Sequence, residues 1–187
     1  MSRDPAQLTA RLGELVDRAE ILDCLHRYTR GMDRLDRELA RSAYHDDAID
    51  VHRDIVKPVD EFLDWAFAYH AEQTRHQHHI TNHTVELDGD TAHTETYYVF
   101  VGASLDRDTP LTVAGGRYID RLERRDGRWA IVRRVCTLEW ATRAPAGGRG
   151  PAVDVEVLLE PFAVARDGTD VSYQRPLTLR SDARPGG

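Results

Sequence analysis

Ionisable side chains gather in one short segment of the chain, RHQHHITNHT. An imidazole titrates near neutral pH and can act as a general base, although most histidines taken singly are only hydrogen-bonded or exposed. If the segment is a strand, alternate residues share a face. One predicted face carries His76, His78 and Asn82, and the opposite face carries His79 and His83. The segment therefore predicts a candidate base on one face of a sheet.

The same histidines suggest a metal site as an alternative. His76 and His78 form an H-x-H pair, and Glu86 or Asp88 could add a carboxylate ligand. No second motif with ligands at a fixed spacing occurs elsewhere in the sequence. Hydrogen-bonded or catalytic histidines are preferred on these grounds, and no metal is predicted.

A second candidate is Arg134, which stands in an otherwise apolar alternating stripe. A guanidinium there is costly unless it meets an anion or lines a wet cavity. Two interpretations follow: Arg134 lines a pocket, or the opposite face of the strand is the buried one. The stripe consists of Ala130, Val132, Arg134, Cys136 and Leu138, and the opposite face of Ile131, Arg133, Val135 and Thr137.

Asp33 is the third candidate, because it follows Gly31 at a predicted helix corner and has Tyr28 one turn earlier. Taken alone, an aspartate at such a corner is most often the N-cap of the next helix. Its position close to a tyrosine also allows a role in a site.

The elements that must position these residues begin with helices. Apolar residues recur every three or four positions from Leu8, and Gly31 ends the pattern. A shorter helix is predicted over about 33–44, a short strand over 48–52, and a third helix from Pro58 to about Thr74.

Four strands are expected after the third helix, near residues 77–88, 91–103, 111–125 and 128–140. Asp-Gly turns join the first pair and the last pair, which is typical of hairpins. Helices followed by consecutive strands indicate an α+β fold with an antiparallel sheet. This order disfavours a Rossmann-type cofactor site.

Composition limits the partners that the chain can have. A net charge of −7 and an isoelectric point near 5.7 argue against nucleic-acid binding, which requires clustered positive charge. Two isolated cysteines support neither a disulfide framework nor a metal motif. The absence of a signal-like segment and of any long apolar run leads us to expect a cytoplasmic protein without membrane contact.

Three segments in this order resemble the SnoaL-like family of the nuclear transport factor two and ketosteroid isomerase superfamily. They are ILDCLHRYTRGMD, HHITN and GGRYIDRLERRDGRWAIVRR, and the resemblance covers roughly residues 8–142. It implies a cone-shaped α+β barrel over 1–143, whose curved antiparallel sheet wraps around N-terminal helices. Residues 144–187, which begin APAGGRGP, are expected to form a partly ordered C-terminal extension.

The branch that the sequence resembles most contains hexachlorocyclohexane dehydrochlorinase, bile-acid 7α-dehydratase and scytalone dehydratase. This resemblance implies a His-Asp dyad without a cofactor, formed by His78 and Asp33. It also implies that Arg134 and Tyr28 are catalytic. The expected substrate-binding residues are Tyr44, His52, Asn82 and Trp140. If His79 faced inward instead of His78, the strand register would shift by one and the dyad assignment would fail.

The resemblance favours a cofactor-independent lyase of the dehydratase type. Its substrate would be small, apolar and cyclic, or similar to a polyketide or steroid. Asp33 would orient His78, which would remove a proton, while Arg134 and Tyr28 would stabilise the developing charge. An isomerase or cyclase with the same dyad, or a non-catalytic binding or assembly module, remains an alternative. A homo-oligomer, either a dimer or a trimer, is also implied.

Overall fold

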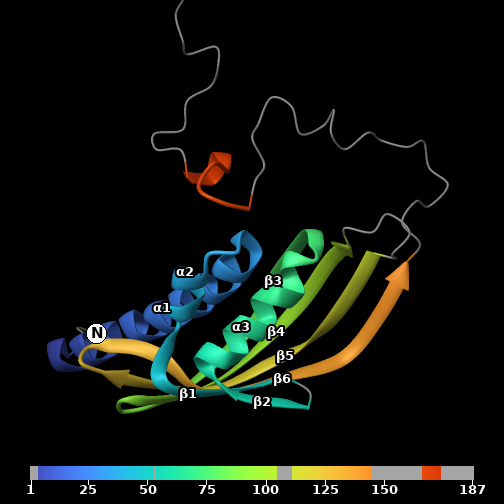
Figure 1. The fold of residues 1–187 in the computed structure, drawn as a ribbon. Coiled ribbons are helices and arrows are strands. Elements are labelled where there is room, and N and C mark those ends of the chain that lie inside the picture. Colours follow the sequence, from blue (N-terminus) through green and yellow to red (C-terminus); the bar gives the residue numbers. More distant parts are fainter. Residues whose placement is uncertain (1–3, 53, 105–110, 145–165, 174–187) are drawn as a thin grey trace, which may run out of the picture. The chain divides into compact units, whose positions relative to one another are not determined.

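The computed structural model describes residues 4–52, 54–104, 111–144 and 166–173 (Figure 1). The chain divides into two compact units, Met1–Ala146 and Gly147–Gly187. The site lies in the first unit. Most of the predicted C-terminal extension, 144–187, lies outside the described residues. No helix in the described ranges is long and apolar enough to cross a membrane.

Helix α1, Pro5–Arg34, is longer than the sequence pattern predicted. It continues through Gly31, because this glycine lets the helix pack closely on α2: an added Cβ would lie 2.4 Å from the backbone nitrogen of Ala40. The helix ends where Leu35 adopts a left-handed conformation with φ of 52°.

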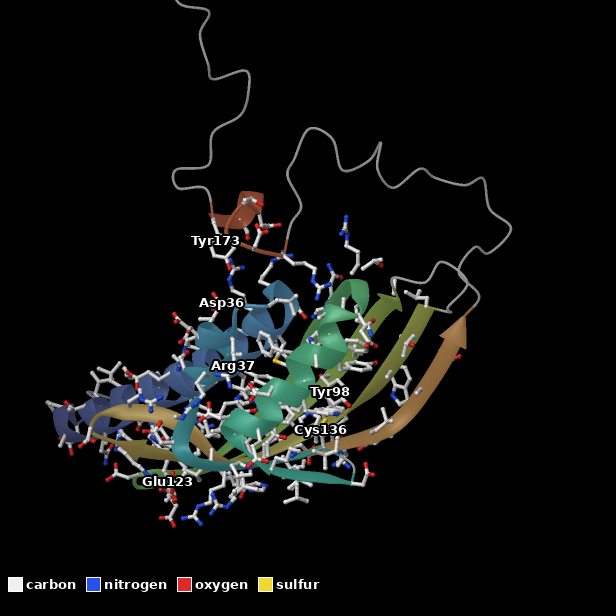
Figure 2. The ribbon with its side chains drawn as sticks, viewed as in Figure 1. Asp36, Arg37, Tyr98, Glu123, Cys136 and Tyr173 are labelled. Atoms are coloured by element: carbon white, nitrogen blue, oxygen red, sulfur yellow. The ribbon has the colours of Figure 1, made fainter. Side chains whose placement is uncertain are left out.

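The second helix, α2, spans only Arg37–Arg41 and is capped by Asp36, not by Asp33 (Figure 2). A carboxylate oxygen of Asp36 accepts a hydrogen bond of 2.9 Å from the backbone N–H of Leu39. The N-cap interpretation of Asp33 is therefore wrong, since this residue lies in the last turn of α1. Its carboxylate is left available for another partner.

Two strands and a helix follow. They are β1, Tyr44–His52, β2, Ile55–Pro58, and α3, Val59–Ala71. Strand β1 is longer than predicted and β2 was not predicted. Helix α3 ends three residues before the predicted Thr74, because the chain enters the next strand at Gln73.

The remaining strands are β3, Gln73–Asp88, β4, Thr91–Ser104, β5, Leu111–Arg125, and β6, Arg128–Ala144. The sheet order is β2-β1-β6-β5-β4-β3. Every pair is antiparallel except β1 with β6, which is parallel. The predicted α+β class is confirmed, with helices covering one face of a curved sheet that does not close on itself (Figure 1).

The core fills the space between the helices and the inner face of the sheet. Its largest buried side chains are aromatic and aliphatic, together with one charged residue, Arg134. Removing this apolar surface from water supplies most of the folding free energy. Representative members are Ile21, Leu25, Tyr28, Phe62, Tyr118, Leu122 and Trp129.

Two irregularities in the ladder change which residues face inward. The β3–β4 register shifts between Ile80 and His83, and the β5–β6 register shifts where Gly115 faces Trp140 and Gly116 faces Leu138. An extra residue in one strand reverses the alternation beyond it. Both shifts affect residues that the sequence placed in the site.

Candidate active site

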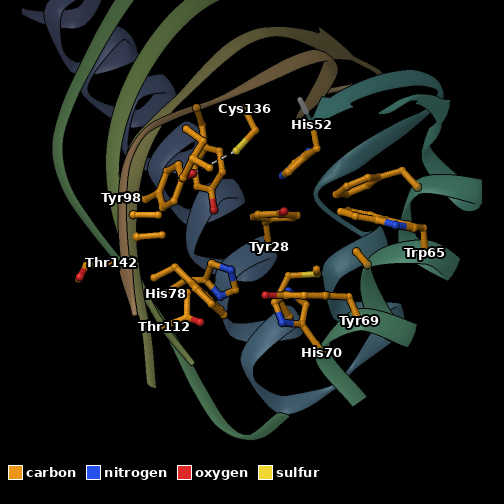
Figure 3. Close-up of a pocket in the computed structure, with 18 residues that line it drawn as sticks. Tyr28, His52, Trp65, Tyr69, His70, His78, Tyr98, Thr112, Cys136 and Thr142 are labelled. Atoms are coloured by element: carbon orange, nitrogen blue, oxygen red, sulfur yellow. Dashed lines mark hydrogen bonds between the residues drawn. The ribbon is translucent and has the colours of Figure 1, made fainter. Parts of the chain in front are cut away.

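A cavity of about 520 Å³ lies between the helices and the inner face of the sheet (Figure 3). This volume is typical of sites for small organic ligands. Most of the lining is aromatic or aliphatic, with a few polar groups among it. The polar lining residues are Tyr28, His52, Tyr69, His70, His78, Tyr98, Thr112, Tyr118, Cys136 and Thr142.

His78 on β3 and Asp33 at the end of α1 meet at this cavity. The imidazole donates through Nδ1 to Asp33 Oδ1 over 2.6 Å. The backbone N–H of His78 also lies 3.1 Å from both oxygens of the same carboxylate. With Nδ1 occupied, the lone pair of His78 is on Nε2. Asp33 therefore fixes both the tautomer and the orientation of the ring.

The two neighbouring histidines, which were alternatives to His78 as the partner of Asp33, do not contact the cavity in the same way. His79 is exposed, and His76 is buried, with its Nε2 donating to the backbone oxygen of Met32 over 2.9 Å. His78 pairs with Phe100 in the β3–β4 ladder, and both residues line the cavity. The register therefore turns His78 inward and His79 outward.

The ligand atoms of Asp33, His76 and His78 all lie within 4.8 Å of one another, a spacing that a metal ion could use. Hydrogen bonds already engage these atoms: His76 Nε2 is a donor to a carbonyl, and Asp33 accepts from His78. A metal ion would have to replace both contacts. The donor set fits a hydrogen-bonded cluster better than a metal centre, and we assign it as such.

A second imidazole–carboxylate pair faces the cavity from β1. His52 Nδ1 donates to Asp50 Oδ1, and Asp50 is fully buried. Its other oxygen accepts a 2.7 Å hydrogen bond from the hydroxyl of Tyr44. Burial lowers the pKa of His52, but the charge of Asp50, its hydrogen bond and contact with Cys136 outweigh burial and raise the pKa to about 9.

Arg134 does not line the cavity, contrary to the sequence prediction. Its guanidinium is fully buried and makes two 2.7 Å hydrogen bonds to the two oxygens of Asp120. The rings of Tyr28 and Tyr118 lie 4.2 and 4.3 Å from its central carbon. Burial lowers the pKa of Arg134, but the charge of Asp120 outweighs it and holds the pKa well above its ordinary value. Asp120 is thus the anion that compensates the charge of Arg134 in the apolar stripe of β6.

Of the two tyrosines that the sequence placed in the site, one lines the cavity and the other supports a buried carboxylate. Tyr28 lines the cavity, and burial raises its pKa, which keeps the hydroxyl protonated. Tyr44 lies outside the lining, because its hydroxyl is used by Asp50 and accepts from Arg134 Nη1 over 3.3 Å. The expectation that Tyr44 binds substrate is corrected: it supports the carboxylate that holds His52.

Asn82 and Trp140 also lie outside the cavity lining. The register shift between Ile80 and His83 leaves Asn82 exposed and turns His83 inward, where its Nδ1 is hydrogen-bonded to Thr96 Oγ1 over 2.8 Å. The shift at Gly115 leaves Trp140 48% exposed against that glycine. Strict alternation along the strand had placed Asn82 on the face of His78, and the family resemblance had placed Trp140 in the pocket.

Many lining residues were missed by the sequence interpretation of the site, and His70, Tyr98 and Tyr118 are examples. His70 follows Phe62, Leu63 and Ala66 on the buried face of α3, and its ring lies 5.3 Å from that of His78. Helical spacing could have identified it. Tyr98 and Tyr118 stack at 4.6 Å on the opposite wall, and only the strand pairing brings them together.

Comparison with known protein families assigns the chain to one of them. A family model for the SnoaL-like domain matches residues 13–135, and the chain belongs to that family. No curated protein sequence matches the chain significantly.

Solved structures provide the wider comparison. The hexachlorocyclohexane dehydrochlorinase LinA-type3 from Novosphingobium barchaimii is 21% identical, with a TM-score of 0.66 over 75% of this chain and 99% of that one. A scytalone dehydratase-like protein from Novosphingobium aromaticivorans is 16% identical, with a TM-score of 0.64 over 73% and 97%. A Mycobacterium tuberculosis protein of unknown function is 21% identical, with a TM-score of 0.62 over 85% and 90%. At these identities the likeness shows the shared fold.

Proposed function

We propose that this protein is a cofactor-independent lyase that eliminates water from a small, apolar, cyclic substrate. The observation that carries the proposal is the Asp33–His78 pair, whose 2.6 Å hydrogen bond fixes a histidine at an aromatic cavity. Two proteins that share the fold are described as a dehydrochlorinase and a scytalone dehydratase-like protein, which supports elimination chemistry.

In the proposed reaction, His78 Nε2 takes a proton from the carbon next to a carbonyl group. The electron pair of that C–H bond forms the new double bond, and the hydroxyl group on the next carbon leaves. The proton held by His78 passes to the departing hydroxide, so that one water is released and the imidazole is restored. Asp33 keeps Nδ1 protonated throughout and stabilises the transient imidazolium.

The other polar groups have supporting roles in this proposal. The neutral hydroxyl of Tyr28 lines the cavity and can donate to a developing enolate oxygen. Arg134 acts as a positioning residue, because its guanidinium contacts Asp120 and the rings of Tyr28 and Tyr118 and not the cavity. This replaces the direct role that the sequence suggested.

The test offers the full chain a panel of cyclic β-hydroxy ketones and follows the ultraviolet absorbance of the conjugated enone product. His78→Gln and Asp33→Asn are each expected to lower turnover by about 10²–10⁴-fold. The matched control is His79→Gln, which removes an exposed imidazole from the next position of the same strand. Turnover that survives in His78→Gln would overturn the proposal.

Two alternatives are separated by the same panel. An isomerase or cyclase would give a product of unchanged mass, whereas elimination reduces the mass by one water. A non-catalytic binding or assembly module would give no product, and its affinity for panel compounds would be the same in the Asp33→Asn and His78→Gln double variant. The predicted homo-oligomer is a separate proposal, checked by light scattering of the full chain.

A further inference from the structure

Cys136 is the cysteine that lines the cavity, and the pairing of β1 with β6 places it next to His52. The two residues are directly opposite each other in the parallel β1–β6 pair, and both line the cavity (Figure 3). The Sγ atom lies 3.5 Å from the hydroxyl oxygen of Tyr98. A thiol at this position is in contact with any ligand that binds in the cavity.

His52 is oriented toward this thiol by its carboxylate. Since Nδ1 of His52 donates to Asp50, Nε2 is the ring nitrogen left for Cys136. Asp50 is itself fixed by the 2.7 Å hydrogen bond from Tyr44, and the ring of His52 stacks on Phe62 at 4.6 Å. Thiol, imidazole and carboxylate thus follow one another as in nucleophilic catalytic sites.

We infer that Cys136, His52 and Asp50 form a nucleophilic thiol site that reacts covalently with small α,β-unsaturated carbonyl compounds in the cavity. This inference is independent of the proposed elimination, since it uses neither Asp33 nor His78. The aromatic walls formed by Phe62, Tyr98 and Tyr118 favour an apolar electrophile.

The reaction is a conjugate addition. Cys136 loses its proton to the solvent beside the imidazolium of His52, and the thiolate forms an S–C bond at the β-carbon of the electrophile. The π electrons of the carbon–carbon double bond move toward the carbonyl group to give an enolate. His52 then donates its proton to the α-carbon and takes another from the solvent, which leaves a neutral thioether and requires no other reactant.

The electrostatic surroundings support an imidazolium beside the sulfur. Contact with Cys136 is one of the causes that raise the pKa of His52 to about 9, together with the charge of Asp50 and against the effect of burial. A positive charge beside a sulfur stabilises the thiolate, which is the nucleophilic form. The titratable and charged groups around the pair come from four strands and one helix: Tyr44, Asp50, Tyr98, Tyr118, Asp120, Arg134 and Tyr28.

Cys24 provides an internal comparison within the same chain. It is fully buried outside the cavity lining, and its thiol donates to the backbone oxygen of Ala43 over 3.1 Å. Burial raises the pKa of Cys24 to about 11. The two cysteines should therefore differ sharply in reactivity.

The experiment treats the full chain with 2-cyclohexen-1-one between pH 6 and 10 and follows each cysteine by peptide mass spectrometry. We expect an adduct on Cys136 that forms at least about tenfold faster at pH 7 than on N-acetylcysteine, while Cys24 stays unmodified. His52→Gln should slow the adduct by about tenfold or more and move its pH profile toward that of an ordinary thiol, near pH 8.5.

Controls separate a specific effect from a structural one. Asp50→Asn should shift the pH profile in the same direction as His52→Gln, whereas His79→Gln removes an exposed imidazole on β3 and should leave the profile unchanged. Circular dichroism checks that each variant is folded. If His52→Gln does not fold, the Asp50→Asn profile decides. Absence of the adduct, or the same rate and profile in the folded His52→Gln or Asp50→Asn variant, would overturn the inference.

Discussion

Two imidazole–carboxylate pairs line one cavity, and they differ in what else holds the carboxylate. Asp33, whose side chain is 19% exposed, accepts from the backbone N–H of His78 as well as from its ring. Asp50 is fully buried and accepts from Tyr44 and His52. The pairs reach the cavity from β3, at one edge of the sheet, and from β1, next to the other edge.

The difference shows how the surroundings give different tasks to the same two residue types. A fully buried carboxylate gains much from a cation beside it, and the pKa of His52 is raised to about 9 in spite of burial. That ring suits a role as proton donor or as counter-ion to a thiolate. His78, held by a carboxylate that is partly exposed to solvent, is the better placed proton acceptor in the proposed elimination.

The largest expected effect is at Arg134, which contacts the imidazole–carboxylate pair on β1 through Tyr44 and does not contact the pair on β3. Arg134→Met leaves the buried carboxylate of Asp120 without its partner and removes a donor to Tyr44. The free energy of unfolding, measured in urea, should fall by about 3–5 kcal/mol.

The comparison for Arg134→Met is Arg125→Met, which breaks ion pairs with Asp47 and Glu123 at the surface. Its loss of stability should be much smaller, because water screens exposed pairs. Equal losses in the two variants would contradict the assignment of Arg134 as the buried support of the β1 pair.

The second effect concerns the pH dependence of stability. The pKa of His52 rises from 6.5 to about 9 on folding, so its contribution is fully present below pH 6.5 and is lost as the pH rises through 9. The contribution is up to about 3 kcal/mol. His52→Gln should flatten the unfolding free energy between pH 6.5 and 10, and His79→Gln, which removes an exposed imidazole, should not. An unchanged slope in His52→Gln would show that the β1 pair is not charged as described.

A third, smaller effect should act on the other pair. In Gly31→Ala the added Cβ would lie 2.4 Å from the nitrogen and 2.7 Å from the Cα of Ala40, so the end of α1 must move. Overpacking of this kind costs about 1–3 kcal/mol. Because Asp33 lies two residues later, turnover by the proposed lyase should also fall, while alkylation of Cys136 should persist.

The control for Gly31→Ala is Gly13→Ala, since nothing lies within 4 Å of an added Cβ at this exposed position of α1. It should stabilise the helix by about 0.5–1 kcal/mol. If Gly31→Ala slowed alkylation of Cys136 as strongly as turnover, the two pairs would not be held independently.

Local patterns were sufficient to predict the class of fold, whereas the pairing of Asp33 with His78 came from the family resemblance. Helical spacing, the two Asp-Gly turns and the strand periodicity identified the α+β order that the structure confirms. The end of α1 was misplaced, because the glycine taken as a stop packs against Ala40 inside the helix. That contact joins two consecutive helices, and it depends on how α2 folds back on α1, which periodicity within one helix cannot reveal.

The second pair, His52 and Asp50, could be predicted from the sequence only in part. Ala48, Asp50 and His52 alternate along β1, and this spacing alone indicates a shared face. The partners of these residues could not be deduced, because the parallel pairing of β1 with β6 brings in Cys136 and Arg134 from more than eighty positions away. Asn82 and Trp140 were misplaced for a related reason, since a single extra residue in a strand reverses its faces.

The smallest expected effect concerns β3 beyond His78, where the register shift changes which residues face inward. Asn82→Ala should change stability by less than about 0.5 kcal/mol and leave turnover unchanged, because its side chain is exposed beyond the register shift. His83→Ala should cost about 1 kcal/mol, since it removes the hydrogen bond to Thr96. Urea unfolding of both variants measures the difference. If Asn82→Ala were the more damaging change, β3 would alternate without interruption, and the inward face that presents His78 would continue to Asn82.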